Sequence, residues 1–215
     1  MIKNIIFDMD GVITMSMPLH YRAWAKVFAD IGIKVSRFEI YRREGQKGLD
    51  SVMEISAKYG KPVGVAVAKE LLLKKERLFK RIVRTRFVPG ARRFIKQCHH
   101  DGLKTGLVTG TARHEVEKIL PDALIKAFDV IVCGSDVRNG KPHPEPYLKA
   151  LGSLKITGGE ALVIENAPFG ITSAVKAGVK CVAIETSLPK VYLREADHII
   201  HDYKELNKIV NGSKK

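Results

Sequence analysis

The sequence predicts an α/β protein: a doubly wound parallel sheet with a small all-helical insert after its first strand. Two observations predict this fold. Short apolar runs alternate with amphipathic helical segments from about residue 86 onward, which is typical of a parallel sheet covered by helices on both faces. The segment 15–85 interrupts that alternation, because it has helical patterns and no convincing strand. We therefore expect an α/β core formed by 1–14 and 86–215, and an all-helical insert formed by 15–85.

The individual elements follow from apolar periodicity and from the residues that end each segment. Glycine after an amphipathic stretch is a helix stop signal, and it occurs at Gly102 and Gly178. Strands are expected at 4–7, 104–108, 130–132, 161–164, 181–184 and, more weakly, 198–200. Core helices are expected at 89–100, 112–120, 144–151 and 168–177, and cap helices at 18–31, 37–43, 49–59 and 65–84. Parallel sheets place their active sites at the carboxyl ends of the strands, so the residues that follow these strands are the candidates for function.

Composition narrows the class of protein. Of the 215 residues, 45% are hydrophobic and 28% are charged, as in ordinary globular proteins. No apolar run is long enough to span a bilayer, and we read no signal peptide at the N-terminus. The cysteines Cys98, Cys133 and Cys181 lie far apart in apolar contexts, which indicates reduced core thiols rather than a disulfide or metal framework. We therefore expect a cytoplasmic protein without a membrane partner, either a monomer or a small homo-oligomer.

The net charge of +14 is compatible with nucleic acid, acidic lipid or small anions as partners. The densest basic stretch is 74–86, and Leu71, Leu78 and Ile82 recur through it at helical spacing. An amphipathic helix with a solvated charged face is favoured over a nucleic-acid-binding stripe, because the stretch holds one aromatic residue and no recognisable binding module. Nucleic acid is therefore not expected as a partner.

Two acids close the first strand. The stretch NIIFDMDGVIT, from Asn4 to Thr14, places Asp8 and Asp10 at the carboxyl end of an apolar run and Gly11 directly after them. Two like charges held close together are costly unless a cation holds them, and Mg2+ prefers oxygen ligands of this kind. A cation also helps a carboxylate to approach a dianionic phosphate. The pair therefore indicates a Mg2+ site.

Three further motifs follow later strands. LVTGTAR places the hydroxyl of Thr109 and the small Gly110 before a helix, whose free amides favour a phosphate. NGKPHPEPY holds Lys141 on a proline-stiffened loop, where a positioned charge and an ordinary surface lysine are equally good interpretations. ALVIENAPFGI places Glu165 and Asn166 beyond an apolar strand, where Asn166 either caps the next helix or offers oxygen to the cation. Together the motifs gather polar groups at one edge of the sheet, which packing does not explain.

In this order the motifs resemble those of the haloacid-dehalogenase-like phosphotransferase superfamily. DMDGVIT resembles the first motif, Thr109 the second, Lys141 in GKPHPEPY the third, and Glu165 with Asn166 the fourth. The resemblance spans the whole chain and implies the family's Rossmann-like core, and the helical insert is similar to the family's small cap. HYRAW, beginning at His20, and the Lys-Pro-x-Pro loop are most similar to the β-phosphoglucomutase subgroup.

The resemblance implies phosphoryl transfer through a covalent intermediate. Asp8 is the implied nucleophile, which forms an aspartyl-phosphate, and Asp10 is the implied general acid and base. Mg2+ is the implied cofactor, held by the Asp8 carboxylate, the backbone carbonyl of Asp10 and the fourth motif, Glu165 and Asn166. The subgroup usually has an acid where this chain has Asn166, so we expect weaker metal affinity. Glu165 would compensate as a direct or water-bridged ligand.

The transferring phosphoryl group would be held by residues of the second and third motifs. The resemblance assigns this role to Thr109, Lys141 and the nearby backbone amides, at Gly110 and Thr111. Catalysis of phosphoryl transfer depends mostly on such positioning and charge stabilisation.

The rest of the substrate would be recognised by the cap. His20 shares a helical stripe with Trp24, and a buried, satisfied histidine and a site role are equally open. The mutases that the chain resembles carry an arginine in the first cap loop, here 42–50, which grips the distal phosphate of a sugar bisphosphate. Gly48 stands near that position with Lys47 beside it, and lysine offers a point charge but no bidentate fork. Arg113 would help to hold a distal anion, although a solvated helix residue is slightly favoured.

Three hypotheses of function result. The first is a Mg2+-dependent phosphatase that hydrolyses a small phosphorylated metabolite. The second is a phosphomutase of the β-phosphoglucomutase type, which uses the same intermediate but excludes water. The missing arginine favours the first. The third is a weakly active phosphate- or nucleic-acid-binding protein, suggested by Asn166 and the charge; the combination of Asp8, Asp10 and Lys141 argues against it.

Overall fold

The computed structural model describes residues 2–212, which form a six-stranded sheet in the order β3-β2-β1-β4-β5-β6. Every neighbouring pair of strands is parallel. The strands are β1 Asn4–Phe7, β2 Lys104–Val108, β3 Val130–Val132, β4 Ala161–Glu165, β5 Lys180–Ile184 and β6 His198–Ile200. Each lies where the sequence predicted one, and β4 and β5 are each one residue longer than predicted. The parallel sheet is therefore confirmed.

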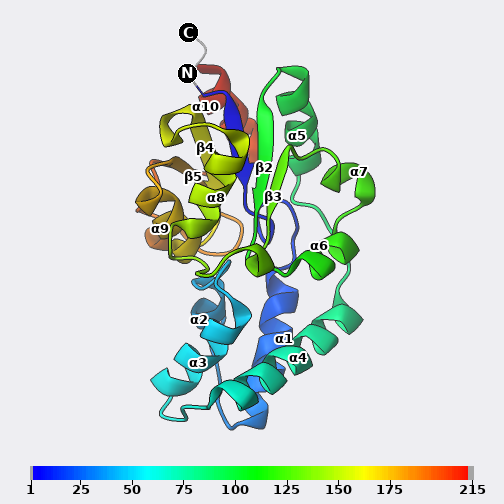
Figure 1. Cartoon of the computed structure of the whole chain (residues 1–215), viewed down its shortest axis with the longest axis vertical. Helices are drawn as coiled ribbons and strands as arrows, with labels where there is room; N and C mark the ends of the chain where they lie inside the picture. Colours follow the sequence, from blue (N-terminus) through cyan, green and yellow to red (C-terminus); the bar gives the residue numbers. More distant parts are fainter. Residues whose placement is uncertain (1, 213–215) are drawn as a thin grey trace.

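Helices cover both faces of this sheet (Figure 1). The core helices are α5 Ala91–His100, α6 Arg113–Ile119, α7 Asp122–Ile125, α8 Glu145–Leu154, α9 Pro168–Lys176 and α10 Tyr203–Gly212. Successive residues of β1 point to opposite faces, as in any strand. Ile6 joins the apolar cluster under α8 and α9, whereas Ile5 and Phe7 join the cluster under α5 and α10. The sheet is thus doubly wound, with β1 buried at its centre.

A separate group of helices lies beyond the carboxyl ends of the strands (Figure 1). These are α1 Met17–Asp30, α2 Arg37–Tyr41, α3 Gly48–Lys58 and α4 Val65–Ile82. Helix α4 packs against both α1 and α3, and the rings of Trp24 and Phe28 on α1 stack at 5.5 Å. Most buried apolar residues of this group belong to the same buried cluster as Ile6 of the sheet, and the group corresponds to the expected helical cap. The limits of the two units, 1–14 with 86–215 and 15–85, remain a prediction.

The chain crosses between core and cap twice, and the two crossings run side by side. Thr14 and Phe87 form an antiparallel bridge. The backbone N–H of Met15 donates to the carbonyl of Arg86 at 2.8 Å, and that of Val88 donates to the carbonyl of Ile13 at 2.9 Å. The cap is therefore joined to the core by a hydrogen-bonded pair of segments.

A few features differ from the sequence-based expectation. Helix α4 ends at Ile82 rather than 84, and α8 continues past 151 to Leu154. The short helix α7 and the helix α10 were not predicted. The three cysteines are buried, as expected of core residues. Among residues 2–212, none of the helices combines the length and apolar composition that crossing a bilayer requires.

Candidate active site at the carboxyl end of the sheet

Asp8 and Lys141 form a buried ion pair at the end of β1. The Nζ atom of Lys141 lies 2.7 Å from Oδ1 of Asp8 and 2.6 Å from Oε1 of Glu165, and it donates to the carbonyl of Val108 at 3.1 Å. Burial disfavours the charge on Lys141, but Asp8 and Glu165 raise its pKa above the ordinary value. Burial also raises the pKa of Asp8 to about 8, against the opposing effect of Lys141. Lys141 is thus a buried, positioned charge and not a surface lysine.

Glu165 binds this lysine through one of its carboxylate oxygens. Its Oε1 accepts hydrogen bonds from Lys141 and from the hydroxyl of Tyr147, the latter at 2.8 Å. Its Oε2 accepts from the backbone N–H of Asn166 at 2.9 Å. Both carboxylate oxygens are therefore engaged by donors inside the protein. The role of Glu165 as a direct or water-bridged ligand of the cation stays a prediction.

Two other buried oxygens suit a hard cation. Oδ2 of Asp8 and Oδ1 of Asn166 have no hydrogen-bond partner among residues 2–212. The amide of Asn166 is fixed because its Nδ2 donates to Oγ of Ser187 at 2.9 Å. It lies over Gly11, where a Cβ would come within 2.0 Å of that nitrogen. Buried polar atoms are rarely left without a partner, and carboxylate and amide oxygens are ligands of Mg2+. Asp8 and Asn166 therefore fit a magnesium site.

The carboxylate of Asp10 is held by three donors, two from the start of α1 and one from the loop after β2. Its Oδ1 accepts hydrogen bonds from Oγ of Ser16 and from Nε2 of His20, the latter at 3.1 Å, and its Oδ2 accepts from Oγ1 of Thr111 at 3.1 Å. Burial acts to raise the pKa of Asp10, but His20 and Ser16 lower it to about 2. Burial and the charge of Lys75 lower the pKa of His20, and a neutral imidazole still donates from one nitrogen. Both carboxylate oxygens of Asp10 are thus oriented by donors inside the protein.

The loop after β2 joins the first motif to the cap. Oγ1 of Thr109 accepts from the backbone N–H of Thr111 at 3.1 Å, and the hydroxyl of Thr111 reaches Asp10. Gly110 lies against the cap loop so closely that a Cβ would come within 2.5 Å of the carbonyl oxygen of Gly45. A side chain at 110 would therefore push the cap loop away from the site.

A cavity of about 230 Å³ lies between the cap and this loop. Four of the predicted binding residues line it: His20, Lys47, Gly110 and Thr111. Because His20 and Thr111 both hydrogen-bond to Asp10, the cavity borders the predicted acid and base. It is the place where a substrate can approach the buried carboxylates.

A comparison with known protein families agrees with this geometry. The sequence model for haloacid dehalogenase-like hydrolases matches residues 5–184. The chain belongs to this family. It is 32% identical over 183 residues to the phosphorylated carbohydrates phosphatase of Thermotoga maritima, a match that covers 83% of this chain and 82% of that protein. Membership of the family, together with phosphatases among the relatives, makes the chain an enzyme of the phosphoric monoester hydrolase type.

Two further relatives bear on the size and shape of this hydrolase. A structure from Bacteroides vulgatus, proposed to be a beta-phosphoglucomutase, matches 96% of this chain and 86% of that one, with a TM-score of 0.83 and 33% identity. Protein Suppressor of Quenching 1, chloroplastic, of Arabidopsis thaliana is 30% identical over 208 residues. That match covers 91% of this chain but only 19% of the plant protein. The hydrolase thus corresponds to a small part of the plant protein and to most of the other two relatives.

Two predicted anion-binding residues of the hydrolase are already engaged by the protein. Nζ of Lys47 donates to the carbonyls of Val137 and Arg138 at 3.2 and 3.1 Å, which ties the cap to the core. The guanidinium of Arg113 pairs with Asp136 and donates to the carbonyl of Ile131 at 3.0 Å. Arg113 is not among the residues that line the cavity. The structure places Arg113 in a surface ion pair, which agrees with the favoured interpretation as a solvated helix residue, and its role at a distal anion stays a prediction.

Sequence reasoning missed Lys75 of this hydrolase. Its ammonium lies 4.9 Å from the ring centre of Phe79 and 5.4 Å from that of Trp24, and only 6% of the residue is exposed. Lys75 also lines the cavity. A signal was available, because Lys75 falls on the buried stripe of α4 together with Ala68, Leu71 and Phe79. The sequence predicted an amphipathic helix with a solvated charged face for the basic stretch 74–86. Lys75 is an exception, because its charge is buried and faces the cavity.

Proposed function

We propose that this hydrolase removes the phosphate group from a small phosphorylated metabolite, a sugar phosphate or a similar monoester, through an aspartyl-phosphate on Asp8. The observation that carries the proposal is the state of that carboxylate. Lys141 binds one of its oxygens, and the other is buried without a partner among residues 2–212. In its ionised form, which a bound cation favours, a carboxylate with one oxygen oriented and one oxygen free is suited to attack phosphorus. We also propose that the enzyme works in the cytoplasm.

The reaction takes place in two halves. An oxygen of Asp8 attacks the phosphorus, and the bond to the leaving oxygen breaks as Asp10 gives that oxygen a proton. A water oxygen then attacks the phosphorus of the aspartyl-phosphate, Asp10 takes a proton from the water, and phosphate leaves with Asp8 restored. With a pKa near 2, Asp10 is ionised before substrate binds. A dianionic phosphate next to it raises its pKa and lets it carry the proton that the first half requires.

Asp8, Asn166 and the backbone carbonyl of Asp10 would hold Mg2+. When bound, the ion supplies positive charge that offsets the repulsion between the carboxylate and the phosphate. Lys141, the hydroxyl of Thr109 and the backbone N–H of Gly110 would hold the phosphoryl oxygens. These groups come from four separate segments of the chain, so their positions depend on the sheet that brings the segments together.

The cavity favours a substrate with hydroxyl groups and one phosphate. Glu44 and Ser51 line it and can bond to hydroxyls. The cations that line it within the described residues are Arg43, Lys47 and Lys75. The guanidinium of Arg43 already binds Glu39, at 2.9 Å, and Lys47 already binds backbone carbonyls. The arrangement therefore offers no free bidentate fork for a second phosphate.

A phosphomutase of the β-phosphoglucomutase type is the second candidate. It is supported by the similar structure from Bacteroides vulgatus, and it would use the same aspartyl-phosphate with a sugar hydroxyl in place of water. A mutase handles a bisphosphate, however, and the engaged states of Arg43 and Lys47 favour the hydrolase.

Phosphate release from a panel of phosphorylated metabolites, with Mg2+ or with chelator, tests the proposal. The panel includes β-glucose 1-phosphate with and without the corresponding bisphosphate, and Asp8→Asn serves as the inactive control. Mg2+-dependent release that is lost in Asp8→Asn supports the hydrolase, whereas isomer formation without release supports the mutase. Release that persists in Asp8→Asn contradicts the nucleophile. Salt-sensitive binding to an arbitrary duplex without any turnover would favour the third hypothesis, a binding protein.

A further inference from the structure

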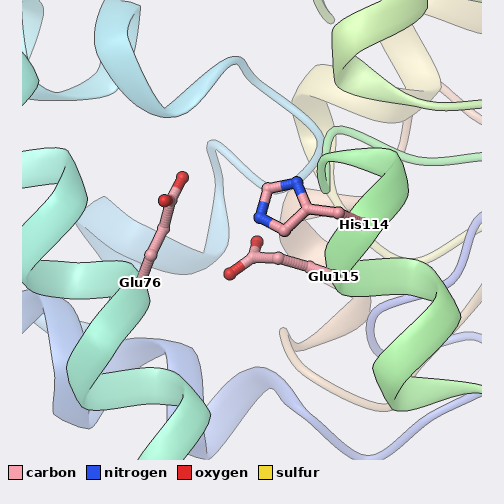
Figure 2. A group of neighbouring side chains, drawn as sticks. All are labelled: Glu76, His114 and Glu115. Atoms are coloured by element: carbon pink, nitrogen blue, oxygen red, sulfur yellow. The ribbon is translucent and has the colours of Figure 1, made fainter.

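Three side chains with metal-ligand atoms face one another across the seam between cap and core (Figure 2). Glu76 comes from α4 of the cap, and His114 and Glu115 come from α6 of the core. One carboxylate oxygen from each glutamate and one ring nitrogen of His114 all lie within 4.8 Å of one another. We call these residues the seam cluster. It uses none of the residues that suit Mg2+ at the ends of the strands.

No side-chain hydrogen bond or ion pair among the described residues accounts for the meeting of these three side chains. Within residues 2–212, none of its three side chains makes a hydrogen bond or an ion pair, with each other or with any neighbour. The two glutamates instead bring like charges together from two different parts of the molecule, which costs free energy. Burial and the charge of Glu76 raise the pKa of Glu115, against the opposing effect of Lys75. A cation held among the three ligand atoms removes this repulsion.

The donor set selects the kind of cation. Mg2+ and Ca2+ prefer oxygen ligands alone, whereas an imidazole nitrogen suits zinc and its neighbours in the first transition row. Zn2+ commonly takes three protein ligands from histidine and carboxylate side chains and completes its shell with water. Zn–N and Zn–O bonds of about 2.0–2.2 Å place the ligand atoms of a tetrahedral site roughly 3.4 Å apart. Ligand atoms that already lie within 4.8 Å reach this spacing through small side-chain rotations.

We propose that the seam cluster binds a divalent transition-metal ion, with Zn2+ as the leading candidate, and that this ion fastens the cap to the core. Glu76 and Glu115 also line the catalytic cavity. All three residues border an adjoining groove of about 170 Å³ between α4 and α6. Substrate entry and product release require a cap to move, so an ion that joins α4 to α6 slows this exchange. The site does not depend on which ester the hydrolase cleaves.

Equilibrium dialysis of the full chain against Zn2+ tests this site, with excess Mg2+ present to occupy the oxygen ligands around Asp8. Glu76→Gln removes the ligand from the cap, and His114→Ala removes one from the core. Since His114 is exposed and Glu76 is only half-buried, neither change disturbs the packed interior. His201→Ala is the matched control, because His201 is an exposed histidine that lies far from the seam cluster in the chain and pairs with Glu185 at 3.0 Å. Binding of Co2+, followed by its visible absorption, gives a second readout of an imidazole-containing site.

Wild type and His201→Ala should each bind one Zn2+, and Glu76→Gln and His114→Ala should each weaken that affinity by more than about tenfold. Equal Zn2+ binding by all four proteins would overturn the proposal, because the ion would then lie elsewhere. A loss confined to His114→Ala would also overturn it, because a site without Glu76 does not join the cap to the core. Absence of Zn2+ binding by wild type would overturn it outright.

Discussion

The ammonium group of Lys141 lies between the carboxylates of Asp8 and Glu165, 2.7 Å from one and 2.6 Å from the other. Each of these side chains is about 1% exposed. Removing one member of a buried charge pair costs far more than an exposed pair contributes, because the remaining charge is left uncompensated. Glu165 therefore holds Lys141 in place, and Lys141 in turn orients Asp8.

Glu165→Gln separates a positioning role from metal ligation. The amide keeps the size of the side chain but removes the charge that opposes Lys141, so we expect kcat to fall by about tenfold or more. The Mg2+ concentration at half-maximal activity should change little, because both Glu165 oxygens are already engaged. Steady-state kinetics over a Mg2+ titration measures both quantities. A Mg2+ requirement that rises steeply with kcat retained would instead place Glu165 on the ion.

Asn166→Asp tests whether residue 166 is a ligand of Mg2+. The amide Oδ1 of Asn166 is buried without a partner among the described residues, and a carboxylate there would add one negative charge beside the cation. Mg2+ affinity increases with the charge of its oxygen ligands, so we expect tighter binding, on the order of tenfold. Titration calorimetry with Mg2+ measures this directly. Unchanged affinity would mean that residue 166 is not a ligand.

Lys75→Met tests the buried lysine of the cap. Methionine keeps the apolar stem of the side chain against Trp24 and Phe79 but removes the charge near His20 and Asp10. We expect the pKa of His20 to rise toward its ordinary value, because the charge of Lys75 lowers it, and activity to fall by more than about tenfold. NMR of the ring protons of His20 and the pH profile of kcat/KM follow the two effects.

Lys74→Met is the matched control for that change. Lys74 is the neighbouring residue on α4, its side chain is 51% exposed, and it pairs with Asp30 at the surface. Exposed ion pairs contribute little, so this variant should keep the wild-type profile. Equal losses in both variants would point to a general effect of charge and not to a role of Lys75 in the cavity.

The sheet and much of the candidate site could be predicted because both depend on local patterns. Apolar runs of three to five residues mark the strands, and parallel strands bring their carboxyl ends to one edge. Asp8, Thr109 and Asn166 therefore meet although they are far apart in the sequence. Helix α10 carries apolar residues at helical spacing, but it follows the weakest predicted strand, and α7 has only four residues. Such short or terminal elements depend on packing more than on pattern.

Side-chain pairing within the site could not be predicted from spacing. Glu165 stands beside Asn166 in the chain, yet it bonds to Lys141 and Tyr147, which approach from a different loop and helix. Arg113 follows the second motif, yet it turns to Asp136. These choices depend on side-chain conformations at a point where several loops converge. The sequence indicates which residues come near the site but not which atoms they bind.

The buried carboxyl of Asp8 makes stability depend on pH and Mg2+. Its pKa is raised from 3.8 to about 8, chiefly by burial. Between these values the folded protein keeps a proton that the unfolded chain has lost, so without metal the free energy of unfolding falls as pH rises. Asp8→Asn lacks this titration. As pH rises from about 4 to 8, the Tm of Asp8→Asn should therefore increase relative to the Tm of wild type. The difference should grow by roughly 2–4 °C for each kcal/mol that the wild type loses in its free energy of unfolding.

Thermal unfolding of both proteins at several pH values, in chelator and in Mg2+, measures this effect. Mg2+ binds the ionised carboxylate, so it should raise the wild-type Tm most at the alkaline end and leave Asp8→Asn almost unchanged. Parallel curves for the two proteins in chelator would show that Asp8 is already ionised without metal. In that case Lys141 alone would outweigh burial, and the free oxygen of Asp8 would not require a cation to become a nucleophile.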